Sequence, residues 1–121
     1  MDTRDIAEAA AISLTGEGHA GQTYDVVGPT LIGGPGNAAT WSKLLGREIR
    51  YSGHNFDQWE QQMRASVSGW QAFDLRAMFQ GYFDRGFAST EVEVARVTKL
   101  LGHAPRSYAD FASETAALWK A

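Results

Sequence analysis

The stretch DTRDIAEAAAISLTG, which occupies residues 2–16, constrains the fold more than any other part of the sequence. Asp2 or Thr3 can cap a helix here, and the acidic residues near its start suit the positive end of the helix dipole. One face of this helix carries mostly small side chains at helical spacing: Ile6, Ala9, Ala10, Ser13 and Leu14. Because small side chains permit close approach, we expect the helix over residues 2–15 to pack directly against another element.

Five further helices are expected downstream. Pro35 is a good first-turn residue for a helix over 35–45, and Asn55 with Gln58 resembles a capping box before the apolar repeat that ends near residue 67. Residues 70–85 are apolar over so wide an arc that we expect burial on more than one side. Thr90 and Ser107 are the expected N-caps of the last two helices.

Two short segments between the helices favour strands. Residues 22–27 alternate in side-chain character, and residues 47–52 do so less regularly. The sequence therefore predicts a mainly helical α+β fold with six helices and two short strands. The loops are short, so we expect residues 1–121 to form a single domain.

Composition excludes several classes of protein. The chain contains no cysteine, so it has neither disulfides nor a thiolate nucleophile, which fits a cytoplasmic location. The formal net charge is −3 and the basic residues are scattered, so binding to nucleic acid is not expected. No apolar run approaches the roughly 20 residues that a membrane-spanning helix needs, so no membrane association is expected either.

Few residues follow a catalytic or metal-binding pattern. The glycine-rich segment 33–36 lacks the lysine and the glycine spacing of a phosphate-binding loop, and is better read as a loop leading into a helix. The three histidines, His19, His54 and His103, lack the spacing of metal ligands, so no metal site is predicted. His54 is the best placed of them to face a pocket. Asp74 forms either a surface charge pair with Arg76 or a polar group aimed into a cavity.

Aromatic residues are concentrated in the middle of the chain. Core packing would explain them, but wide apolar arcs with a few polar groups also line small-molecule pockets. The residues predicted to bind a ligand are Trp41, Trp59, Trp70, Phe73 and Tyr82.

Four segments, in order along the chain, resemble segments of the NmrA-like proteins, which are atypical short-chain dehydrogenases. The opening "Asp2-Thr3-Arg4-Asp5-Ile6-Ala7-Glu8-Ala9-Ala10" is similar to the family segment "V-D-x-R-D-I-A-x-A", which opens a helix. The others are residues 21–29, residues 44–51 and residues 101–111. Each segment alone is a weak signal, but the four together cover the whole chain.

The resemblance implies that the chain corresponds to the C-terminal two-fifths or so of such a protein. That portion forms one wall of the substrate cleft, so the helix over 70–85 and the loop around His54 would face the cleft. The nucleotide-binding half carries a Gly-x-x-Gly-x-x-Gly turn and often a Tyr-x-x-x-Lys pair, and neither occurs here. We therefore expect no cofactor site in this chain alone, with NAD(P) implied only when the other half is supplied.

Three functions remain open from the sequence. The first is a small-molecule-binding domain that holds an apolar or aromatic ligand and is not a self-sufficient NAD(P)-dependent oxidoreductase. The second is a cofactor-free enzyme, such as a cyclase or isomerase acting on a hydrophobic metabolite, with His54 or Asp74 as catalytic candidates. The third is a truncated fragment that needs a separate partner chain with the nucleotide-binding half. The small-residue helix face and the strand edge would need cover, which predicts a homodimer, possibly strand- or helix-swapped.

Overall fold

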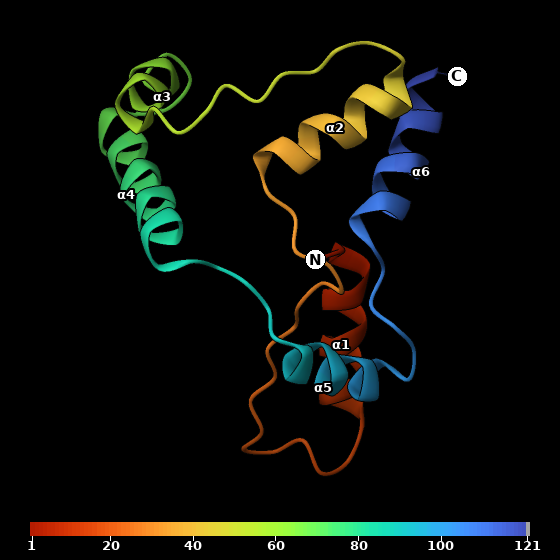
Figure 1. Cartoon of the computed structure of the whole chain (residues 1–121). Helices are drawn as coiled ribbons and strands as arrows, with labels where there is room; N and C mark the ends of the chain where they lie inside the picture. The colour runs from red at the N-terminus through yellow and green to blue at the C-terminus, as the bar shows by residue number, and fades with distance from the viewer. Residues whose placement is uncertain (121) are drawn as a thin grey trace. The chain divides into compact units, whose positions relative to one another are not determined.

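A computed structural model describes residues 1–120, and all its regular elements are helices (Figure 1). They are α1 (Thr3–Thr15), α2 (Gly34–Leu45), α3 (Phe56–Met63), α4 (Gly69–Arg85), α5 (Glu91–Leu101) and α6 (Tyr108–Lys120). The chain divides into two compact units, one made of residues 1–51 with 89–120 and the other of Ser52–Ala88. This division does not by itself test the predicted single domain, which stays a prediction.

The helix starts that the sequence indicates are confirmed. The Asp2 carboxylate accepts a hydrogen bond from the Arg4 amide at 2.8 Å and caps α1. Hydrogen bonds from the Arg4 side chain and amide lower the pKa of Asp2 to about 2, so this cap stays ionised. Asn55 caps α3, and Thr90 forms a reciprocal capping box at the start of α5. α3 is shorter than expected, since it ends at Met63.

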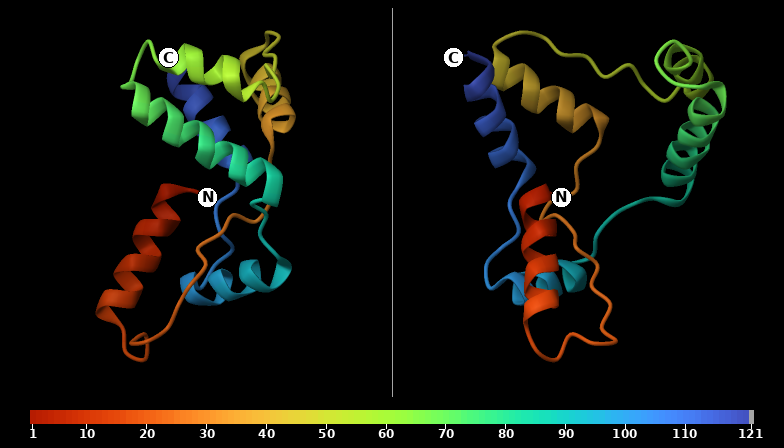
Figure 2. Two further views of the ribbon diagram at one scale, coloured as in Figure 1. Left: turned by 90° about the vertical axis from the view of Figure 1, so that its left-hand side faces the viewer. Right: turned by 180° about the vertical axis from the view of Figure 1, so that it is seen from behind.

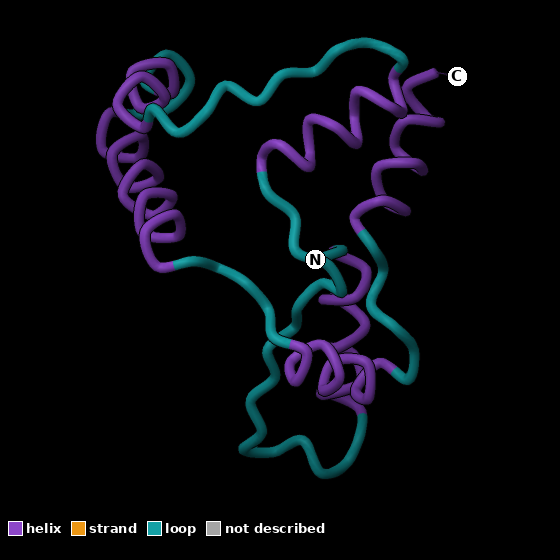
Figure 3. The backbone as a smooth tube through the Cα atoms, in the orientation of Figure 1, coloured by secondary structure: helices purple, strands orange, loops and turns teal. Residues whose placement is uncertain are grey.

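The predicted strand at 22–27 is wrong. Within residues 1–120 the backbone contains no strand, and this segment runs as an extended loop (Figure 3). Its side chains explain the apolar pattern, because Val26 and Val27 pack against the core formed by α1 and α5. A strand needs a paired neighbour, whereas this segment is held by side-chain burial.

The predicted strand at 47–52 is also wrong, for a local reason. The Ser42 hydroxyl on α2 accepts a hydrogen bond from the Ile49 amide at 2.8 Å and lies 3.3 Å from the Ile49 carbonyl oxygen. The Ser42 side chain thus bonds to the Ile49 backbone, which would otherwise be available to pair with a neighbouring strand. The fold is therefore all-helical over the described residues, and a strand-swapped dimer loses its basis.

Of the face predicted for α1, Ala9 alone is buried inside its own unit, whereas Ile6, Ala10 and Leu14 are exposed, so the predicted face is wrong in most of its residues. Ala9 forms a buried core with Val97 and Leu101 of α5, and Ile12 packs against that core. α2 packs against α6, where Ala112 and Ala116 are buried. The right-hand view of Figure 2 shows α2 beside α6, and α1 crossing in front of α5. Because α5 covers the core-facing part of α1, this helix does not require a second chain for that purpose.

The other unit is a hairpin of α3 and α4. Arg76 of α4 reaches across to α3 and pairs with Asp57 at 2.7 Å and with Glu60 at 3.5 Å. Among the helices of residues 1–120, none is long and apolar enough to cross a membrane.

Candidate functional site

Two aromatic pairs lie on one side of the α3–α4 hairpin. Trp59 of α3 meets the Phe79 ring edge-on, with centroids 5.3 Å apart. Tyr82 of α4 stacks on Phe87, with centroids 4.5 Å apart and planes 28° apart. Phe79 and Tyr82 are three residues apart, so they project about 60° from each other around the helix. We call these four side chains, Trp59, Phe79, Tyr82 and Phe87, the ligand face.

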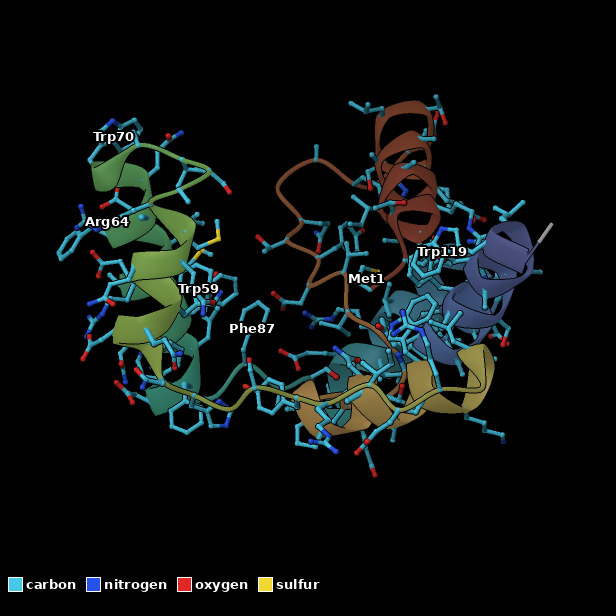
Figure 4. All side chains as sticks on the ribbon, turned by 90° about the horizontal axis from the view of Figure 1, so that it is seen from above. Met1, Trp59, Arg64, Trp70, Phe87 and Trp119 are labelled. Carbon is cyan, nitrogen blue, oxygen red and sulfur yellow. The ribbon has the colours of Figure 1, made fainter. Side chains whose placement is uncertain are left out.

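The other residues predicted to bind a ligand lie elsewhere. Trp70 and Phe73 are 68% and 55% exposed and belong to another side of α4, which with Ala77 we call the outer face. Trp59 lies beside the middle of the hairpin and Trp70 at its end (Figure 4). Trp41 belongs to the other unit, where it stacks on Trp119 at 5.0 Å. Its indole Nε1 donates a hydrogen bond to the Tyr108 hydroxyl at 2.9 Å.

The two catalytic candidates are both exposed. His54 stacks on Phe83, with ring centroids 4.2 Å apart, and lies 6.3 Å from the Phe56 ring. Asp74 lies on α4, whereas Arg76, its expected partner in a surface charge pair, bonds to α3 instead. Neither side chain is enclosed, and the catalytic roles of His54 and Asp74 stay predictions.

A cluster of charged residues in the larger unit was missed by the sequence analysis. Asp5 of α1 is fully buried and accepts hydrogen bonds from the Arg106 backbone amide, at 2.7 Å, and from the Arg106 guanidinium. The same guanidinium bonds Glu8 at 3.2 Å, and Glu8 also meets His103 Nε2 at 3.0 Å. This ion-pair cluster ties α1 to the loop between α5 and α6. The residues of α1 and those of the loop both lie in segments that resemble NmrA-like proteins. No other feature of the sequence indicates that they are in contact.

The cluster is built as a structural tie. One carboxylate oxygen each from Asp5 and Glu8 and a ring nitrogen of His103 lie within 4.8 Å of one another, as metal ligands would. The Arg106 guanidinium, however, already bonds to both carboxylates and supplies the positive charge. Hydrogen bonds from His103 and Arg106 hold the pKa of Glu8 below its usual value.

His103 is placed to carry a positive charge. Its Nδ1 lies 2.8 Å from the Ala104 carbonyl oxygen and its Nε2 lies 3.0 Å from Glu8. Both partners are acceptors, so both ring nitrogens must be protonated to satisfy them. The bond to the Ala104 carbonyl, followed by that to Glu8, raises the pKa of His103, while the nearby Arg106 opposes the rise.

A pH dependence of stability follows from this arrangement. The charged imidazole contributes stability that is fully present below the unfolded-state value of 6.5 and is lost as pH rises through the raised folded-state value. Urea unfolding at a series of pH values should therefore show a falling midpoint across the neutral range. His103→Gln should remove this dependence and His54→Gln should keep it, whereas a midpoint that rises with pH in the wild-type chain would contradict the assignment.

A small pocket of about 160 Å³ lies where the first turns of α1 and α6 meet. Its lining residues are Met1, Asp2, Thr3, Ser107, Tyr108 and Phe111. None of them belongs to the set predicted to bind a ligand, although Tyr108 accepts the hydrogen bond from Trp41.

Two known proteins resemble the chain in sequence. It is 31% identical over all 121 residues to the NAD(P)H azoreductase of Xenophilus azovorans, of which it spans 42%. The protein that it resembles along its full length is thus named as an oxidoreductase. Over 51 residues it is 43% identical to the (4-alkanoyl-5-oxo-2,5-dihydrofuran-3-yl)methyl phosphate reductase of Streptomyces griseus subsp. griseus, and covers 18% of that protein. The chain thus spans less than half the length of either relative. No family model and no solved structure matches it.

Proposed function

We propose that this chain is the substrate-binding portion of an NAD(P)H-dependent reductase of the NmrA-like type. The observation that carries the proposal is the identity of 31% to an NAD(P)H azoreductase, which extends over all 121 residues of this chain. The four segments that resemble NmrA-like proteins support the same assignment. Two of them, residues 2–10 and 101–111, contain Asp5 and Arg106, which hold α1 to the loop before α6.

The ligand face is the proposed wall against which the substrate lies. Trp59 and Tyr82 each present an aromatic ring held by a second ring, so neither must be ordered when a flat ligand stacks on it. A planar conjugated compound fits such a surface, and the azo group in the first relative's name belongs to that chemical class. Trp41 is retained as a proposed ligand-binding residue of the larger unit, where Tyr108 and Trp119 orient its ring.

The cofactor is proposed to be bound by a nucleotide-binding portion that this chain does not contain. A dinucleotide site needs a glycine-rich turn that lets the backbone approach the pyrophosphate, and the Gly-x-x-Gly-x-x-Gly pattern is absent from the sequence. The reduced nicotinamide would supply the hydride, and the present residues would bind and orient the acceptor. The expected cytoplasmic location stays a prediction.

Calorimetric titration of the chain tests this division of roles. An uncharged azobenzene, used as the probe for a planar conjugated ligand, should bind with saturable heat. NADPH should give only its heat of dilution under the same conditions. Tight binding of NADPH by this chain alone would contradict the proposal.

A further inference from the structure

The α3–α4 hairpin has almost no core of its own. Of residues 52–88, all of which are described, Ala72 alone is buried. The hairpin nonetheless exposes seven large apolar side chains by more than a third of their surface: Trp70, Phe73, Met78, Phe79, Tyr82, Phe83 and Phe87. Helices in proteins owe most of their stability to burial of an apolar face. We therefore expect another surface to cover the exposed apolar side chains of this hairpin.

The outer face of α4 is asymmetric along its length. Its first half carries the large rings of Trp70 and Phe73, followed by the small Ala77. The continuation of the same face carries Gly81 and then the charged pair Asp84 and Arg85. The aromatic rings of this face thus lie toward one end of the helix Gly69–Arg85, and a glycine and two charged residues lie toward the other, with Ala77 at the centre.

This distribution is complementary to itself when a second copy is turned end for end. About a two-fold axis through Ala77, Phe73 of one copy lies opposite Gly81 of the other, a position that has no side chain of its own. Trp70 then lies opposite Asp84, with Arg85 one position further along, so its indole N–H can meet the carboxylate that also accepts from Gln80, and its ring can meet the guanidinium. Arg85 lies over Gly81 in the single chain, and its long side chain can turn aside to reach that ring.

We propose that the outer face of α4 is a homodimer interface, in which two copies of this chain pack α4 against α4 in antiparallel orientation about Ala77. The interface explains why Trp70 and Phe73 are the most exposed of the predicted ligand-binding residues, and assigns them to the partner chain. Trp70 and Tyr82 are twelve residues apart, which places them about 120° apart around the helix. The dimer therefore leaves the ligand face open, and does not depend on the proposed function.

Sedimentation velocity of the full chain tests the interface. The wild-type chain should be a dimer at micromolar concentration, whereas Ala77→Glu and Ala77→Lys should each be monomeric, because like charges meet on the axis. Mixing these two variants in equal amounts should restore a dimer, since opposite charges then face each other. Ala95→Glu, an exposed alanine in the middle of α5, is the matched control and should remain dimeric.

Three results would overturn the proposal. They are a monomeric wild-type chain, a dimer that survives Ala77→Glu, and an equimolar mixture of the Glu and Lys variants that stays monomeric. Circular dichroism of each variant separates loss of the dimer from loss of the fold, and an unfolded variant could not produce the restored dimer. These readouts need neither NADPH nor an azo compound, so failure of the interface and failure of the proposed function are distinguishable.

Discussion

Asp5→Asn should lower the free energy of unfolding by about 3 kcal/mol, a large fraction of the stability of an ordinary domain. Asp5 is fully buried and accepts hydrogen bonds from both the backbone amide and the guanidinium of Arg106. Asparagine has nearly the same shape, but it loses the charge and turns one acceptor into a donor that faces another donor. Urea denaturation followed by circular dichroism measures the change directly.

Asp57→Asn is the matched control for this prediction. Asp57 also pairs with an arginine, at 2.7 Å, but its side chain is 80% exposed. Exposed ion pairs contribute less than about 1 kcal/mol, so this variant should unfold close to the wild-type midpoint. Equal losses from the two variants would show that burial of the ion-pair cluster does not decide its strength.

Trp59→Ala should weaken binding of an azobenzene by about tenfold, because removal of one stacked ring costs on the order of 1.4 kcal/mol. Trp59 is held against Phe79 on the ligand face, so its ring is ordered before the ligand arrives. The titration should show the same stoichiometry with a higher dissociation constant.

Trp70→Ala provides the comparison for Trp59→Ala. It removes the same side chain from the same hairpin, but from the outer face, where Trp70 is 68% exposed. Affinity for the azobenzene should then stay within about twofold of the wild-type value. A greater loss from Trp70→Ala than from Trp59→Ala would move the ligand to the outer face and contradict both assignments.

The parts of the fold that could be predicted are those determined by neighbouring residues. Helix starts depend on a cap and the next three residues, so Asn55 and Thr90 could be identified from the sequence. The strands could not be decided in this way, because alternation at 22–27 arises equally from a loop that buries Val26 and Val27. At 47–52 the deciding partner is the Ser42 hydroxyl, seven residues from Ile49, which no pattern within the segment reveals.

The sequence predicts which types of residue form the candidate site, but not how their side chains are arranged. Aromatic enrichment is visible in the sequence, but the wide apolar arc of α4 hides the fact that Tyr82 and Trp70 lie on different sides of it. The ion-pair cluster joins Asp5 to Arg106 across 101 positions, so it depends on how the helices pack. Both residues lie in segments that resemble NmrA-like proteins. That resemblance does not reveal that the two side chains are in contact.

The central claim, that this chain binds the acceptor and leaves the nucleotide to another portion, is tested most directly by paired calorimetric titrations. An uncharged azobenzene and NADPH are each added to the wild-type chain in the same buffer. We predict saturable binding of the azobenzene at one site per chain, and no binding of NADPH. Saturable binding of NADPH, or no heat from the azobenzene at concentrations of about 1 mM, a level that would still detect weak binding, would contradict the account.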